Sequence, residues 1–110
     1  MKWLKFFISP KKIAWDKVNE LFLNDNDNKY LLLDVRQPFE HKEQSIKNSV
    51  LIPLLEISQK ISMIDKNKTI FVFCRSGKRS SIASRILQTK GYKNLFSVKG
   101  GIKAFNKLNK

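Results

Sequence analysis

Short apolar segments that lack an alternation of apolar and polar residues recur along the chain. Segments with helical periodicity separate them. Residues 30–35, 69–73 and 95–98 are such apolar runs, and the run at 69–73 is β-branched or aromatic throughout. A strand that is apolar on both sides is typical of a parallel sheet covered on both faces. The alternation therefore predicts an α/β fold with a central parallel sheet flanked by helices on both faces.

The N-terminal segments fit the same alternation. We expect a short strand at residues 5–8 and a helix from Ser9 and Pro10 to about Leu23. Serine is a preferred N-cap residue, and proline suits the first helical position. The polar stretch 24–28 has turn chemistry and ends this helix before the first apolar run.

The later segments give four further helical patterns and one weaker strand. We expect a helical turn within 39–44, a short strand at 49–52 and a closing helix at 102–108. A helix follows the segment 74–80 and ends near Gly91, a favoured residue just beyond a helix end. Two sets of residues recur at helical spacing and define buried faces: Leu54, Ile57, Ile61 and Ile64, and then Ile82, Ala83, Ile86 and Leu87.

The chain length predicts one unit. With 110 residues it is long enough for one buried core, so we expect a single domain over residues 1–110. One cysteine excludes a multi-disulfide scaffold. No segment approaches the run of roughly 18 apolar residues that a membrane span needs. Lys5 interrupts the first apolar stretch, so we expect no signal peptide and a cytoplasmic protein.

The charge is strongly one-sided. The chain has 22 Lys and Arg residues against 9 Asp and Glu, a formal net charge of +13. Such a field attracts anions, including nucleic acid and small oxyanions. The lysines are scattered along the chain rather than clustered in one segment. A biased genome composition would also produce many scattered lysines. Nucleic acid is therefore disfavoured as a partner, and the charge alone does not separate an anionic partner from genome composition.

The segment directly after the strand at 69–73 carries the chemistry. It contains Cys74, Gly77 and three cations, and ligands of open α/β sheets bind at the carboxyl ends of strands. Gly77 allows the backbone to curl so that its amides point inward, and a following helix adds its positive end. Cations and helix N-termini favour a thiolate, so we expect Cys74 to be a nucleophile. The candidate substrate-binding residues are Arg75, Ser76, Gly77, Lys78, Arg79 and Ser80.

Several short motifs, in order along the chain, resemble those of rhodanese-like sulfurtransferases. Asp34-Val35-Arg36 resembles the family's strand-end signature, and Pro38-Phe39-Glu40 resembles its Pro-x-Glu. The segment from Cys74 to Ser80 is similar to the family's common active-site loop. Further matches are Ile46, Ile52-Pro53, Gly91-Tyr92 and Val98-Lys99-Gly100-Gly101-Ile102.

The resemblance implies a rhodanese-like fold with five parallel strands and a sulfur transfer through Cys74. The thiolate would take sulfane sulfur from a small anionic donor such as thiosulfate, and a thiol or a thioredoxin-like protein would accept it. It implies no cofactor, no metal and no membrane partner. The chain departs from the family pattern at 44–48, where the usual histidine is missing, and at Phe105, where tryptophan is common.

We expect five other residues to have structural rather than catalytic roles. We interpret Asp34 and Arg36 as an ion pair that supports the site rather than as catalysts. We place His41, the single histidine, on the surface. Trp3 and Trp15 are expected to pack in the core or at an edge.

Two alternatives stay open. A cysteine-dependent phosphatase or arsenate reductase uses similar chemistry, but its motif resembles Cys-x5-Arg, and that position here is Ser80. Arg79 follows after four intervening residues, and a shorter loop favours sulfur over phosphate. The other alternative is a non-catalytic or sulfur-delivery module that binds a partner, although such modules often lose the cysteine that this chain keeps.

Overall fold

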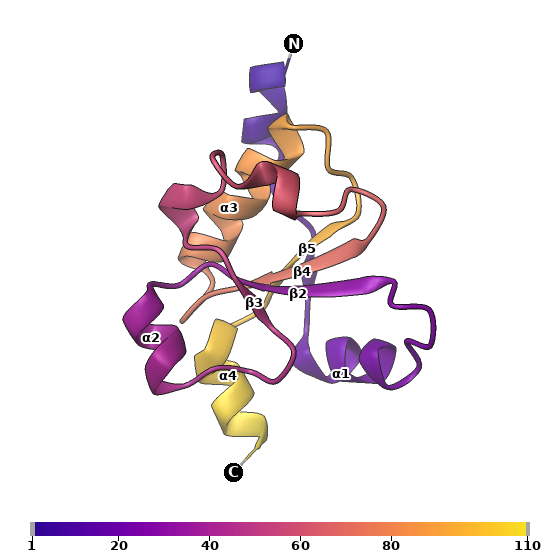
Figure 1. Cartoon of the computed structure of the whole chain (residues 1–110), viewed down its shortest axis with the longest axis vertical. Coiled ribbons are helices and arrows are strands. Elements are labelled where there is room, and N and C mark those ends of the chain that lie inside the picture. The colour runs from indigo at the N-terminus through magenta and orange to yellow at the C-terminus, as the bar shows by residue number, and fades with distance from the viewer. Residues whose placement is uncertain (1, 110) are drawn as a thin grey trace.

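A five-stranded parallel sheet forms the centre of the protein. The computed structural model describes the backbone of residues 2–109 and the side chains of 4–109, so the prediction for Trp3 lies outside the described side chains. The strand order is β1-β5-β4-β2-β3, and every neighbouring pair is parallel, which confirms the predicted fold class (Figure 1). The strands are β1 (Lys12–Ile13), β2 (Tyr30–Asp34), β3 (Val50–Leu51), β4 (Thr69–Phe73) and β5 (Leu95–Val98).

Helices cover both faces of the sheet. On one face lie α3 (Lys78–Thr89) and the 3-10 helices η1 (Lys2–Phe7), η2 (Leu54–Glu56) and η3 (Ile61–Met63). On the other face lie α1 (Trp15–Leu23) and α4 (Gly101–Leu108), and α2 (Pro38–Glu43) follows β2 at the carboxyl edge (Figure 1). Within residues 2–109, no helix has the length and apolar character that crossing a membrane requires.

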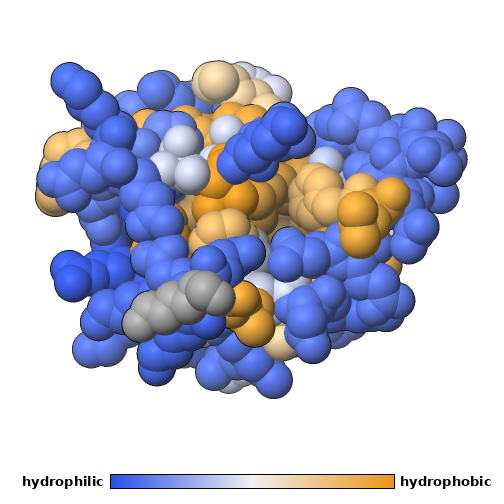
Figure 2. Space-filling view, turned by 90° about the horizontal axis from the view of Figure 1, so that it is seen from below, coloured by the Kyte–Doolittle hydropathy of each residue, from blue (hydrophilic) through white to orange (hydrophobic). Residues whose placement is uncertain are grey.

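The side chains of β4 explain why that strand shows no polar alternation. Ile70 and Val72 belong to the core cluster on the α3 side, and Phe71 and Phe73 belong to the cluster on the α1 side. All four are buried, since each face of the strand meets a helical layer. Figure 2 views the molecule from the side of α1 and α4 and shows apolar residues at the centre of this face, surrounded by hydrophilic ones.

The N-terminal predictions were wrong in detail. Residues 5–8 lie in and just after η1 rather than in a strand, and α1 begins at Trp15 rather than at Ser9 and Pro10. The strand at this end is β1, which hydrogen-bonds to β5 through Ser97 N–H to Lys11 O and Lys99 N–H to Ile13 O, both at 2.8 Å. The open edge of β5 provides these partners, and local sequence preferences do not reveal a distant strand edge.

Two helical faces differ from expectation. Ile57 and Ile64 are buried in the α3-side cluster as predicted, but the segment forms the separate turns η2 and η3 instead of one helix. In α3, Ala83 and Leu87 are buried, whereas Ile82 keeps 42% of its surface exposed. Helix α3 also begins at Lys78, inside the segment 74–80 that it was expected to follow, because Gly77 adopts a positive φ of 116° and turns the chain directly into the helix.

Candidate active site

The candidate site is the loop between β4 and α3. Cys74 directly follows β4 and is 1% exposed, and its Sγ accepts the Gly77 N–H at 3.1 Å. Gly77 reaches this position with a φ of 116°, a conformation that favours glycine. The predicted inward-pointing amide is therefore present at the sulfur, next to the first turn of α3.

A pair of buried serine hydroxyls lies behind the sulfur. Ser80 Oγ is 3.7 Å from Cys74 Sγ and 2.8 Å from Ser97 Oγ, and both serines are buried. Ser80 was among the predicted loop residues, whereas Ser97 was not. In the sequence, Ser97 stands out only as a hydroxyl residue in an otherwise apolar strand. Its place beside the site becomes clear from the sheet register, which pairs Ser97 with Val72 of β4, two residues before Cys74.

The N-terminus of α4 holds the other side of the loop. Ile102 N–H donates to Cys74 O at 2.8 Å, and Lys103 N–H donates to Arg75 O at 3.1 Å. Gly101 packs so closely that an added methyl group would collide with Cys74 O and lie 2.6 Å from Arg75 O. Trp15 Nε1 in turn donates to Gly101 O at 2.8 Å. The loop from Cys74 to Gly77 is thus held by both α3 and α4.

Arg79 is engaged by a carboxylate that the sequence analysis did not assign to the site. Its Nη1 and Nη2 donate to the two carboxylate oxygens of Glu40 at 2.6 and 3.0 Å. The hydrogen bond from Arg79 lowers the pKa of Glu40 to about 2, and the same bond raises the pKa of Arg79. The proposed contact of Arg79 with a donor anion stays a prediction, and it competes with this pair.

Asp34 and Arg36 form the predicted ion pair, and Asp34 also contacts His41, which we had expected on the surface. Arg36 donates from Nε and Nη2 to the Asp34 carboxylate at 2.9 and 2.8 Å, and both side chains are buried. Arg36 also donates to Gln44 O at 2.6 Å, which ties the end of α2 to β2. His41 is half-buried rather than on the open surface, because its Nδ1 lies 2.9 Å from Asp34 Oδ2.

The remaining loop side chains point to solvent. Arg75, Ser76 and Lys78 are exposed, and within residues 4–109 none of them has a carboxylate at ion-pair distance. They belong to the same loop as the buried Cys74 sulfur, which accepts the Gly77 N–H. A cysteine at the end of a parallel strand and the start of a helix, with a backbone amide directed at its sulfur, has surroundings that favour a thiolate.

Comparison with known proteins identifies the family. The Rhodanese-like domain family profile matches residues 17–108. A tRNA uridine(34) hydroxylase from Pelagibacter ubique is 39% identical over 98 residues, which cover 86% of this chain and 30% of that protein. Thiosulfate sulfurtransferase PspE from Escherichia coli is 34% identical over 73 residues, which cover 64% of this chain and 69% of that protein. The chain belongs to the rhodanese-like domain family.

A solved structure agrees with this assignment. The crystal structure of a rhodanese-related protein from Thermoplasma volcanium has a TM-score of 0.79 and 33% identity, and the match covers 89% of this chain and 92% of that one. Some curated relatives are much longer, since the chain spans 30% of the hydroxylase and 43% of a putative sulfur carrier protein from Bacillus subtilis. The matches establish the fold and the family of this chain.

Proposed function

We propose that the protein is a sulfurtransferase that carries sulfane sulfur on Cys74, with thiosulfate as one donor. The observation that carries this proposal is the Gly77 N–H at 3.1 Å from Cys74 Sγ, in a loop whose exposed side chains include two cations. An amide directed at the sulfur stabilises negative charge on it, and the cations attract an anionic donor. The names of relatives such as PspE support the same reaction class.

The reaction has two displacement steps. The Cys74 thiolate attacks the outer sulfur of thiosulfate, the S–S bond of the donor breaks, and sulfite leaves with its electron pair. A nucleophilic acceptor then attacks the outer sulfur of the persulfide, and the pair of that S–S bond returns to Cys74 Sγ. Cyanide serves as the acceptor in an assay, and a thiol or thioredoxin-like protein serves in the cell, for which we propose the cytoplasm.

A change at the nucleophile tests the proposal. We expect Cys74→Ser to abolish thiocyanate formation from thiosulfate and cyanide, because a serine hydroxyl forms no persulfide. Mass spectrometry of the parent after exposure to thiosulfate should show one added sulfur on the peptide that contains Cys74. Circular dichroism confirms that the variant is folded. Thiocyanate formation near the parental rate in Cys74→Ser would overturn the proposal.

An assay with an aryl phosphate separates this reaction from phosphoryl transfer. Four residues separate Cys74 from Arg79, and Arg79 is held by Glu40, so the loop offers no free arginine at that position for a phosphoryl group. We expect hydrolysis by the parent to equal that of Cys74→Ser at neutral pH. Hydrolysis well above that control would make a phosphatase the better assignment.

A further inference from the structure

The N-terminal segment presents large apolar side chains to solvent. Leu4, Phe7 and Ile8 keep 49%, 70% and 58% of their surface exposed, whereas Phe6 is half-buried. The segment is part of η1 and the residue after it, and η1 lies at one end of the longest axis of the molecule (Figure 1). We call Leu4, Phe7 and Ile8 the N-terminal apolar patch. Apolar side chains that gather on a surface in this way mark an interaction site.

Side chains of α3 hold this segment in place. Arg85 Nη1 donates to Phe6 O at 3.0 Å. Gln88 Nε2 donates to Lys5 O and to Ile8 O, both at 3.0 Å. These three hydrogen bonds fix the backbone of the segment against α3. The exposure of the N-terminal apolar patch is therefore a property of the folded protein.

The charge around the patch has one sign. Lys5 lies within η1, Lys11 and Lys12 follow it, and all three are exposed. Lys93 and Lys5 line a hollow of about 220 Å³ beside the patch. Residues 4–15 contain no Asp or Glu, and among the described residues none of these four lysines has a carboxylate at ion-pair distance. Lysines around exposed apolar side chains suit a partner that is anionic at its surface and apolar beneath it.

An anionic lipid bilayer fits this surface better than a second copy of the chain. The patch lies at a projecting end of the molecule, and a lipid interface accepts projecting side chains without a matching pocket (Figure 1). A second copy would bring the lysines around both patches together, and their like charges oppose that contact. The negative surface of a cytoplasmic leaflet attracts the same lysines.

We infer that the N-terminal segment binds the protein to the surface of an anionic membrane. Leu4, Phe7 and Ile8 insert at the level of the lipid headgroups, and the surrounding lysines contact lipid phosphates. The segment lies outside residues 17–108, which the family profile matches. The expectation of no membrane partner came from the family resemblance, and the motifs that carry this resemblance all lie within the matched part.

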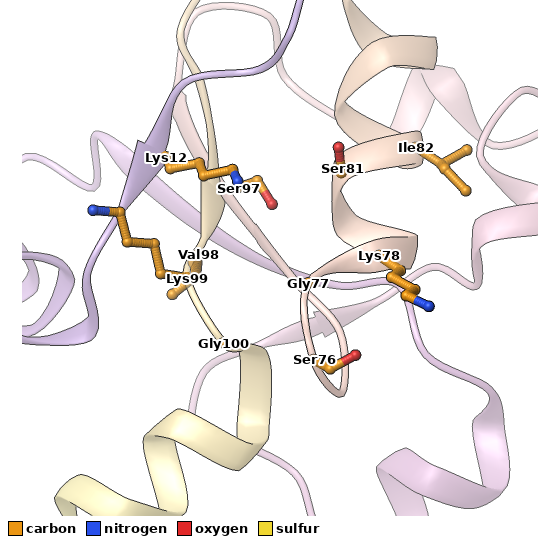
Figure 3. A pocket seen from close by; sticks show the side chains of 10 residues that line it. All are labelled: Lys12, Ser76, Gly77, Lys78, Ser81, Ile82, Ser97, Val98, Lys99 and Gly100. Atoms are coloured by element: carbon orange, nitrogen blue, oxygen red, sulfur yellow. The ribbon is translucent and has the colours of Figure 1, made fainter.

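The patch is distant from the loop that holds Cys74. Figure 3 shows the loop end of α3, where Ser76 and Gly77 lead into the helix at Lys78. Gln88, which holds the patch, lies roughly 15 Å further along the helix axis. Binding to a bilayer through the patch therefore leaves the loop accessible, and the inference does not rest on the proposed function.

Sedimentation with lipid vesicles tests the inference. The anionic probe is a vesicle of equal parts phosphatidylglycerol and phosphatidylcholine, and the neutral probe is phosphatidylcholine alone. We expect the parent to bind the anionic vesicles and not the neutral ones. Phe7→Ser should weaken this binding roughly tenfold, because the phenyl ring no longer enters the interface. Lys5→Gln should weaken it roughly fivefold, because one cation near the lipid phosphates is lost.

Phe39→Ser and Lys107→Gln are the matched controls. Phe39 is also an exposed phenylalanine, at 64%, but it lies on α2. Lys107 is an exposed lysine of α4, at the opposite end of the molecule from η1 (Figure 1). We expect both variants to bind the anionic vesicles as the parent does. Losses equal to those of Phe7→Ser and Lys5→Gln would overturn the inference, because they would show attraction by net charge alone.

A fluorescent label measures insertion directly. In a Cys74→Ser background, Ile8→Cys and Phe39→Cys each provide a single position for a polarity-sensitive fluorophore. We expect the emission to shift to the blue with anionic vesicles for the label at position 8 and not for the label at position 39. A shift at both positions, or at neither, would overturn the inference. These proteins lack the nucleophile, so membrane insertion and the proposed function are tested separately.

Two further measurements complete the test. Circular dichroism and thiocyanate formation without vesicles should give parental values for Phe7→Ser, since its side chain is far from the loop that holds Cys74. Size-exclusion chromatography reports self-association. A dimer of the parent that Phe7→Ser converts to a monomer would assign the patch to a second copy and would overturn the inference.

Discussion

Among single residues, Glu40 has a role in the structure that its position in the sequence did not indicate. Its carboxylate is 14% exposed and holds Arg79, whose side chain is 30% exposed, through two short hydrogen bonds. The pair joins α2 to the first turn of α3, beside the catalytic loop. Arg79 therefore contributes to the position of the loop, in addition to any contact with an anionic donor.

The lowered pKa of Glu40 predicts a loss of stability in acid. The folded-state value of about 2 lies below the ordinary 4.5, so the stabilisation is complete above about pH 5 and is lost as the pH falls towards 2. We expect Glu40→Gln to lower the free energy of unfolding by about 2 kcal/mol at pH 7, after allowance for partial exposure, and by much less at pH 2. Denaturant titrations at both pH values measure the difference.

Glu56→Gln is the control for this prediction. Glu56 also forms a short ion pair, with Lys60 at 2.7 Å, but both side chains are over one third exposed. We expect this change to cost less than about 0.5 kcal/mol at either pH. A cost for Glu40→Gln that does not differ between pH 7 and pH 2 would contradict the assigned role of the Glu40 charge.

Arg75 is the loop arginine that we propose for binding a donor anion. It is exposed, and none of its described neighbours forms an ion pair with it, whereas Arg79 is held by Glu40. We expect Arg75→Ala to raise the apparent KM for thiosulfate roughly tenfold, the effect of one charge-assisted hydrogen bond, and Lys78→Ala to raise it less. Steady-state kinetics at fixed ionic strength measure this. A smaller effect at Arg75 than at Lys78 would contradict it.

At the scale of the elements, the loop keeps its shape because α4 begins directly against it. Backbone amides of Ile102 and Lys103 donate to the carbonyls of Cys74 and Arg75, and Trp15 of α1 donates to Gly101 O. Glycine is required at the start of α4, since Gly101 has a positive φ of 54° and no room for a side chain. The loop that holds Cys74 is thus positioned by elements from both ends of the chain.

Gly101→Ala tests this arrangement. The methyl group would collide with Cys74 O and strain the backbone, so we expect a loss of about 2–4 kcal/mol in the free energy of unfolding. Sulfur transfer should fall even under conditions in which the variant is fully folded. Gly91→Ala is the control, because Gly91 also has a positive φ, of 91°, but its nearest contact is the end of the flexible Lys66 side chain at 3.4 Å. Equal activity losses in the two variants would argue against the role of α4.

At the scale of the whole molecule, the net charge of +13 acts on the approach of anions. We expect the second-order rate constant for persulfide formation from thiosulfate to fall as salt is added, because screening weakens long-range attraction. Lys29→Ala should slow the reaction slightly at low salt and have no effect at high salt, whereas Arg75→Ala should matter at both. Stopped-flow measurements across a salt series decide this. A Lys29 effect equal to that of Arg75 at high salt would refute the loop as the anion site.

The sequence alone was sufficient for the elements that are defined by a few consecutive residues. The strands β2, β4 and β5 were predicted from apolar runs, because a strand buried on both faces has no need of polar positions. The candidate site loop could also be predicted, since its cysteine, glycine and cations lie within the segment 74–80. Family motifs of the same kind indicated the rhodanese-like fold, and the family comparison confirmed it.

Tertiary structure decided the features that join distant segments. Strand β1 exists because β5 has an open edge, and Ile82 is exposed because its side chain is directed away from the sheet (Figure 3). The Glu40–Arg79 pair links positions 39 residues apart, and Ser97 meets Ser80 across 17 residues. Local periodicity reports the burial of a residue but not its partner, because a partner is fixed only when the sheet and its helical layers pack together.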